Sequence, residues 1–143
     1  MPSDLFFKTM STVHRSLIMV SGGRRGWQVS DMPALKLTTT GRRTGRPRSV
    51  MLTSPLKDGA ALVVVASRGG DTKSPAWLLN LESDPDVEVA LRGLPRQRMR
   101  ARVATADERG RLWPHIVADH PRYGGYQMKT KREISLVLLT PVP

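Results

Sequence analysis

The chain has 143 residues, a length that suits one domain with one hydrophobic core. It carries 23 Lys and Arg against 12 Asp and Glu, and the formal net charge of +11 indicates an acidic partner without specifying a fold. Cysteine is absent, which excludes a disulfide framework, a thiolate metal site and a cysteine nucleophile. No apolar run approaches the roughly 18 residues of a membrane-spanning helix, and the start lacks the features of a signal peptide. We therefore expect a cytoplasmic protein.

Residues 1–20 place apolar side chains at near-helical spacing with basic residues between them, which predicts an amphipathic N-terminal helix. Such a helix can lie on a membrane surface, or it can dock on its own domain. The sequence leaves both alternatives open, so peripheral membrane association stands beside a purely cytoplasmic location.

The middle of the chain predicts a three-stranded antiparallel meander. A threonine-rich strand at 34–40 is followed by a returning strand at 48–56 and an almost wholly apolar strand at 61–67. The dipeptide Asp58-Gly59, between the second and third strands, is a strong hairpin signal. We expect the third strand to be buried on both faces.

The second half of the chain predicts short helices between further strands. Ser74 as N-cap and Pro75 at the first helical position begin a helix that should end near residues 84–85. Thr105 and Glu108 have the form of a capping box at the start of another helix. The remaining elements are strands at 87–91, 99–105 and 134–140 and a short helix at 123–129.

Roughly six strands with interspersed short helices do not alternate as βαβ units. This order favours a mainly β (α+β) fold over residues 1–143, in which an antiparallel barrel carries flanking helices. The sequence contains neither a Gly-x-Gly-x-x-Gly motif nor a Walker loop, so the usual nucleotide clamps are missing.

Two glycine-punctuated basic loops each follow a strand. In the second loop, Ser67 and Arg68 add hydrogen-bond donors, while Gly69 and Gly70 allow backbone N–H groups to approach a ligand. Guanidinium groups bind phosphate and carboxylate in two-pronged fashion, so the first loop is either an anion clamp or a solvated basic turn. Its four arginines are Arg42, Arg43, Arg46 and Arg48.

The groups available for acid–base chemistry are few. Tyr123 and Tyr126 lie three residues apart on one helical face, where they could form a pocket wall, donate a proton or simply be half-buried. His14, His115 and His120 show no metal-ligand spacing, so we expect no metal site. A site rich in anion clamps but poor in acid–base groups suits a redox cofactor, because the cofactor carries the chemistry.

Over most of its length the sequence resembles the deazaflavin-dependent nitroreductase family of actinobacteria, whose members bind coenzyme F420. The resemblance implies an FMN-binding-like split β-barrel that holds F420 in a groove. The segments that carry it are Thr-Thr-Thr-Gly-Arg-Arg-Thr-Gly-Arg-Pro-Arg at 38–48, Val-Ala-Ser-Arg-Gly-Gly at 65–70, Pro-Ala-Trp-Leu-Leu-Asn-Leu at 75–81, and Pro-Arg-Tyr-Gly-Gly-Tyr-Gln at 121–127 with the residues to 134.

The resemblance also implies roles for individual residues. Candidates for catalysis are Ser67 and Tyr126, together with His120, a possible proton donor that the family's best-known nitroreductase lacks. The implied cofactor-binding residues are Arg42, Arg43, Thr44 and Arg48 at the phosphate and glutamate tail, Val50, Met51 and Leu52 along the deazaflavin, and Ala66, Ser67, Arg68, Gly69, Trp77 and Tyr123 around it.

The sequence departs from the family's best-known nitroreductase at two places. Residues 51–55 stand where that enzyme has an active-site tyrosine, and His120 stands where it has the first of three clustered tyrosines. We therefore expect the cofactor site to be retained and the substrate pocket to be altered.

The function implied is that of an oxidoreductase that transfers a hydride from F420H2 to a small hydrophobic, electron-poor acceptor such as a quinone, an enone or a nitro compound. One alternative is a non-catalytic protein that carries F420 or another small anion. A basic nucleic-acid-binding domain is disfavoured, because the arginines group at two glycine loops and aromatic residues make up only 5% of the chain. We expect no specific nucleic-acid partner.

Overall fold

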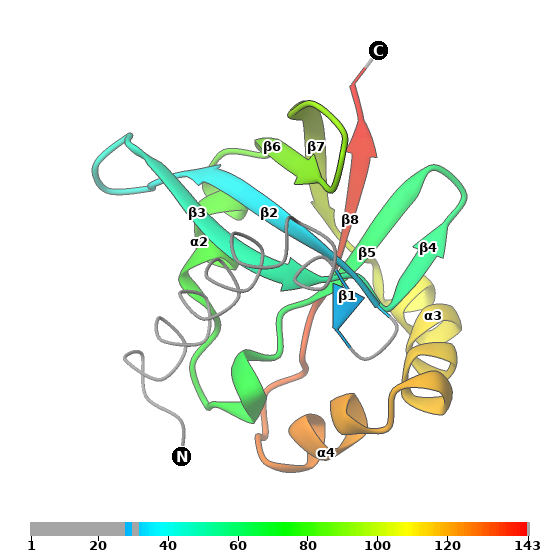
Figure 1. Cartoon of the computed structure of the whole chain (residues 1–143). Coiled ribbons are helices and arrows are strands. Elements are labelled where there is room, and N and C mark those ends of the chain that lie inside the picture. Colours follow the sequence, from blue (N-terminus) through cyan, green and yellow to red (C-terminus); the bar gives the residue numbers. More distant parts are fainter. Residues whose placement is uncertain (1–27, 30–31, 143) are drawn as a thin grey trace.

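A computed structural model describes residues 28–29 and 32–142, so the helix expected at 1–20 and its membrane contact lie outside the described residues. Eight antiparallel strands form one curled sheet with helices around it (Figure 1), as the sequence predicts for a mainly β barrel. Among the described residues, no helix is long and apolar enough to cross a membrane. The elements are β1 (Gln28–Val29), β2 (Met32–Thr40), β3 (Pro47–Thr53), β4 (Leu56–Asp58), β5 (Ala61–Val65), η1 (Arg68–Gly70), α2 (Ala76–Ser83), β6 (Asp86–Leu91), β7 (Gln97–Val103), α3 (Ala106–Asp119), α4 (Arg122–Met128) and β8 (Leu136–Pro141).

The expected meander is wrong in one respect. β2 and β3 form one hairpin, and β4 and β5 form a second one at Asp58-Gly59, as predicted. However, β5 pairs with β8 instead of β3, and the strand order is β1-β2-β6-β7-β8-β5-β4 with β3 paired to β2. Because β3 has no second partner among the described strands, the barrel is split between β3 and the β4–β5 hairpin, where the strand order ends.

Ser54 closes this barrel at one end and also breaks the strand expected at 48–56. Its amide donates to the carbonyl of Pro33 in β2 at 2.9 Å. Its hydroxyl lies 2.8 Å from the carbonyl of Val63 in β5 and 3.0 Å from that of Leu56, so it can donate to either. Pro55 follows and offers no N–H to a strand ladder. The buried serine therefore joins the two ends of the sheet at a corner between β3 and β4.

Two hydrophobic clusters cover the two faces of the sheet. β5 contributes to both, because alternate side chains of a strand point to opposite faces. Leu62 and Val64 pack in the cluster that includes α2, while Ala61, Val63 and Val65 pack in the cluster that includes α3 and α4. The burial of β5 on both faces is thus confirmed. Figure 1 shows α3 and α4 together at one end of the molecule, away from α2.

The helix starts were predicted with mixed success. Thr105 and Glu108 form the expected capping box, with reciprocal bonds of 3.2 Å and 2.9 Å. The N-cap prediction for Ser74 is wrong: Pro75 has an extended backbone (ψ 149°) and is itself the N-cap, so α2 begins at Ala76. The other strands and α4 lie within two residues of their expected ends.

The closing corner is tested by Ser54→Ala. The substitution removes the hydroxyl but leaves two carbonyls in a buried position, so we expect the free energy of unfolding to fall by about 1–3 kcal/mol. Chemical denaturation measures this fall. The matched control is Ser83→Ala on the exposed end of α2, which should change stability by no more than about 0.5 kcal/mol. An equal loss in both variants would contradict the role assigned to Ser54.

Candidate functional site

The turn between β2 and β3 is exposed and basic, and it is closed by backbone hydrogen bonds. The amide of Gly41 donates to the carbonyl of Arg46 at 2.8 Å, and the amide of Gly45 donates to the carbonyl of Gly41 at 2.8 Å. Gly45 has φ +72°, a conformation that favours glycine. The turn therefore presents a fixed group of donors to solvent. Its exposed side chains include those of Arg42, Arg43, Thr44, Arg46 and Arg48.

The buried side-chain amide of Asn80 in α2 anchors this turn through hydrogen bonds. Its Oδ1 accepts from both the backbone N–H and the guanidinium of Arg42, each at 3.2 Å. Its Nδ2 donates to the hydroxyl of Thr39 in β2 at 3.2 Å, and Asn80 is only 5% exposed. Because every contact of the amide goes to one end of the hairpin, α2 determines where the basic turn lies.

The second loop, between β5 and α2, has an unusual backbone. Arg68, Gly69 and Gly70 all have positive φ, at +45°, +62° and +85°, and Arg68 is the single non-glycine residue of this kind among those described. A β-carbon on Gly70 would lie 2.7 Å from the carbonyl oxygen of Tyr126, so this position requires glycine. The loop is thereby packed directly against α4. Ser67, at the start of the turn, is 9% exposed and makes no side-chain cap bond to it.

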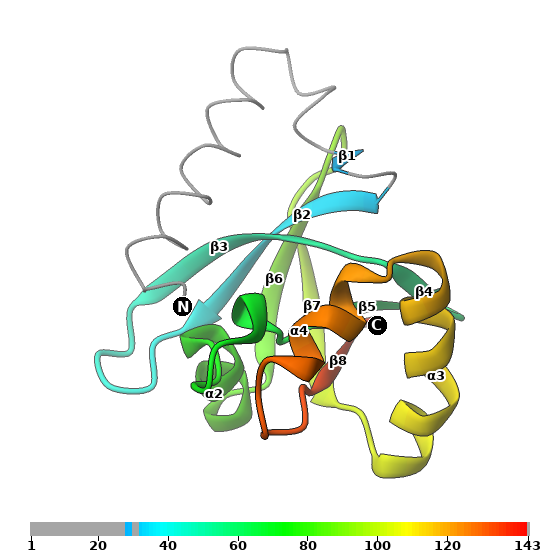
Figure 2. The same ribbon diagram turned by 90° about the horizontal axis from the view of Figure 1, so that it is seen from below.

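Between the basic turn and α4, β3 presents a partly uncovered apolar surface. Val50 and Leu52 are half-buried and pack against the cluster that contains α2. The side chain of Met51 points to the opposite face of the strand. A ligand on the Val50 and Leu52 side would therefore contact Met51 through its backbone. Trp77 is 8% exposed within the same cluster as Ala66, which places its ring in the core. In Figure 2, β3 runs from the basic turn toward α4, with η1 and α4 beneath it.

Three aromatic side chains gather where α3 meets α4. The ring of Tyr123 lies edge-on to His120 and Tyr126, with centroids 6.3 Å and 6.0 Å apart. The hydroxyl of Tyr123 is within hydrogen-bonding distance of Thr53 (3.3 Å) and donates to the sulfur of Met32 (3.6 Å). Burial raises the pKa of Tyr123, although the bond with Thr53 opposes this. Tyr126 and His120 are half-exposed, so their polar atoms are better placed to meet a ligand.

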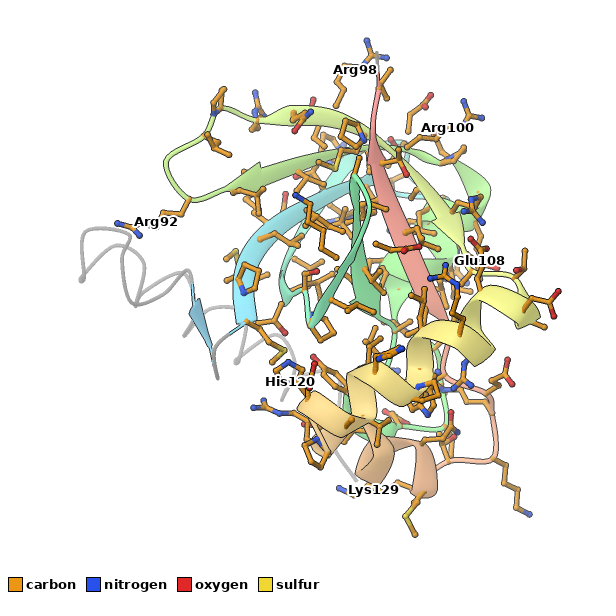
Figure 3. The ribbon with its side chains drawn as sticks, turned by 90° about the vertical axis from the view of Figure 1, so that its right-hand side faces the viewer. Arg92, Arg98, Arg100, Glu108, His120 and Lys129 are labelled. Carbon is orange, nitrogen blue, oxygen red and sulfur yellow. The ribbon has the colours of Figure 1, made fainter. Side chains whose placement is uncertain are left out.

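The arginines are less confined to the two loops than the sequence suggested. Arg98, Arg100 and Arg102 alternate along β7 and are exposed, and Figure 3 shows Arg98 and Arg100 at the opposite end of the molecule from His120 and Lys129. Some of this charge is paired, because Arg102 forms a salt bridge to Glu108 at 2.6 Å. A hollow of about 300 Å³ lies nearby. It is lined by residues of β2, β6, the basic turn and the β6–β7 hairpin, but not by the second loop or the tyrosines.

The sequence reasoning missed two residues that support the site. Asn80 lies three residues after Trp77, which places a polar side chain on the buried face of α2 and is the signal that could have identified it. Arg132 donates to carbonyls of the second loop, and nothing in its local sequence predicts that contact. Among the described residues, no cluster of His, Asp or Glu is suited to a metal ion.

Known proteins are similar to this chain over nearly its whole length. A sequence profile of the family described as F420H(2)-dependent quinone reductase matches residues 10–141. An F420H(2)-dependent quinone reductase of Mycobacterium tuberculosis is 37% identical over 132 residues, which cover 90% of this chain and 87% of that protein. A solved structure of an F420-H2 dependent reductase is 34% identical, with a TM-score of 0.65, and the match covers 75% of this chain and 93% of that one.

Replacing Asn80 tests the anchor of the basic turn. Asn80→Ala leaves the Arg42 amide without its acceptor, so we expect faster hydrogen exchange at that amide and a loss of about 1–3 kcal/mol in stability. Asn80→Asp is the matched control, because it keeps an acceptor oxygen at the same place. The Arg42 amide should exchange more slowly in Asn80→Asp than in Asn80→Ala. Equal exchange rates at this amide in both variants and the unsubstituted protein would contradict the anchor.

Proposed function

Because the chain belongs to the F420H(2)-dependent quinone reductase family, we propose that it is an oxidoreductase that uses reduced coenzyme F420 to reduce a quinone. The observation that carries the proposal is the split in the barrel. One end of this split has a hydrogen-bonded turn with four arginines, and the other end has the aromatic side chains of α4. Enones and nitro compounds are further acceptors to test.

The residues present fit this cofactor, which joins a flat deazaflavin to a phosphate and a glutamate tail. Exposed guanidinium groups of Arg43 and Arg48 match phosphate and carboxylate oxygens. The half-buried side chains of Val50 and Leu52 offer an apolar surface for a ring. The Ser67 hydroxyl makes no capping hydrogen bond to η1, so it can donate to a polar atom at the edge of the ring. An elongated, anionic ligand therefore finds suitable chemistry along the whole split.

When bound, F420H2 supplies the hydride, and reduction of a quinone to a hydroquinone takes a proton in addition. Tyr126 is the candidate to hold that proton, because it is half-exposed on α4. Tyr123 is less suited, because burial raises its pKa and its hydroxyl already donates to Met32. His120 lies beside Tyr123 and is the second candidate donor. The protein's main contribution would be to hold the two reactants together, which removes the entropy cost of their encounter.

Cofactor binding is tested with arginine variants that leave the turn intact. Arg42 also bonds to Asn80, so Arg43→Ala and Arg48→Ala separate binding from anchoring. Each should weaken F420 binding by about 1.5–3 kcal/mol, roughly 10- to 150-fold, in a fluorescence titration. The loss should be much smaller for a deazaflavin that lacks the phosphate and tail.

The control for charge is Arg92→Ala. It removes an exposed arginine that follows Leu91 of β6, and Leu91 pairs with Leu35, six residues before the basic turn begins at Gly41. This variant should retain nearly full F420 affinity. If Arg92→Ala weakens binding as much as Arg48→Ala does, the turn acts only through net charge. If the unsubstituted protein does not bind F420, the proposed function is wrong.

The proton donor is tested by Tyr126→Phe, with Tyr123→Phe as its matched control. Tyr126→Phe should lower kcat with a soluble naphthoquinone by up to about 10²–10⁴-fold and leave F420 affinity nearly unchanged. Tyr123→Phe should have a smaller effect on kcat. A large loss in His120→Gln, with full activity in Tyr126→Phe, would assign the proton to the imidazole instead. Tight F420 binding without turnover on quinones, enones or nitro compounds would favour a carrier.

A further inference from the structure

We propose that Arg132 is a positioning residue that holds the second loop, residues 66–71, in its ligand-binding shape and at a fixed distance from α4. The inference rests on the proposed function, because it assumes that this loop contacts F420. Arg132 lies more than 60 residues along the chain from the loop, between α4 and β8.

The guanidinium group of Arg132 binds both ends of the loop at once. Its Nη1 donates to the carbonyl of Ala66 at 3.1 Å, and its Nη2 donates to the carbonyl of Ser67 at 2.9 Å. Its Nε donates to the carbonyl of Asp71 at 2.9 Å. A planar group with donors in a fixed fork sets the relative positions of its three acceptors, which a lysine ammonium does not do.

The backbone around Arg132 is itself fixed to α3 and α4. Gln127 of α4 donates to the carbonyl of Arg132 at 2.7 Å and accepts from the amide of Ile134 at 2.9 Å. Arg109 of α3 donates to Gln127 at 3.0 Å and to the carbonyl of Ile134 at 2.8 Å. The loop is therefore tied, through Arg132 and Gln127, to the helix that carries Tyr126.

The loop has reason to need this support. Arg68 has a positive φ, which is uncommon for a residue with a β-carbon, and Gly69 and Gly70 have positive φ as well. Two bonds within the loop, from Gly70 to Ser67 at 2.9 Å and from Asp71 to Arg68 at 3.1 Å, hold it locally. Fixing Ala66, Ser67 and Asp71 from outside keeps the turn closed. It also keeps Ser67 at a constant place relative to Tyr126, since Gly70 packs on the Tyr126 carbonyl.

The test compares Arg132→Lys with Arg100→Lys, the same substitution at an exposed and distant arginine. Hydrogen exchange is measured on the protein without cofactor. In Arg132→Lys, the amides of Gly70 and Asp71 should exchange roughly tenfold faster or more, while the amides of β7 keep their rates. Arg100→Lys should change neither set.

A second measurement connects the loop to the cofactor. Arg132→Lys should weaken F420 binding roughly tenfold, which corresponds to the loss of one or two bonds in the loop. The KM for the quinone should change less, provided that α4 keeps its place. Gln127→Ala, which leaves the Arg132 side chain present, should shift exchange and F420 affinity in the same direction by a smaller factor. It serves as the test if Arg132→Lys does not fold.

Two results would overturn the inference. One is unchanged exchange at Gly70 and Asp71 together with unchanged F420 affinity in Arg132→Lys. The other is a uniform rise in exchange over the whole protein, which would make Arg132 a general stability residue. Failure of the unsubstituted protein to bind F420 would overturn the proposed function instead, and it would remove the cofactor role of the loop while the exchange data still report on its shape.

Discussion

The barrel of this protein depends on one buried corner. Ser54 is bonded through its amide to β2 and through its hydroxyl to β5, so it joins two strands that are not neighbours in the sheet. Closure at this corner leaves β3 paired with β2 alone among the described strands. The inner side chains of β3 then remain half-exposed. The same interaction that completes the barrel at one end keeps it open along the rest of β3, where a flat ligand could lie.

Both loops of the candidate site are hydrogen-bonded to polar side chains from other parts of the chain. Asn80 of α2 binds the first loop, and Arg132 binds the second. In each case the supporting side chain satisfies backbone groups of the loop, and in the first loop the side chains of Arg43 and Arg48 are exposed to solvent. This arrangement suits recognition of an anion, because donors fixed before binding lose less entropy when the ligand arrives.

The helix pair α3–α4 contributes the other side of the candidate site. Gln127 accepts a hydrogen bond from Arg109 of α3 and binds the backbone on both sides of residue 133, so these bonds join α4 to the segment that leads into β8. Tyr123 is buried against Thr53 and Met32, and Tyr126 lies on the same helix but is half-exposed. Two tyrosines three residues apart thus have different environments, and only one of them is suited to give up a proton to a ligand.

Local features of the sequence predicted most elements of the fold, although the strand expected at 48–56 is broken at Ser54 and the N-cap of α2 is Pro75. An almost wholly apolar run predicts the burial of β5 on both faces, and Asp58-Gly59 and the Thr105–Glu108 capping box predict a hairpin and a helix start. These signals act over a few residues, so they can be read without knowledge of the rest of the chain. The arginines and glycines of residues 41–48 and 67–70 likewise identify both loops of the candidate site.

The pairing of β5 with β8, the corner at Ser54 and the support from Asn80 and Arg132 required the tertiary structure. Each joins segments that are far apart in the sequence, or depends on where a distant strand ends. A serine followed by proline looks the same in a solvated loop and in a barrel corner. Hydrogen-bond donors such as those of Arg132 can satisfy many carbonyls, and only the folded chain selects the three that they bind.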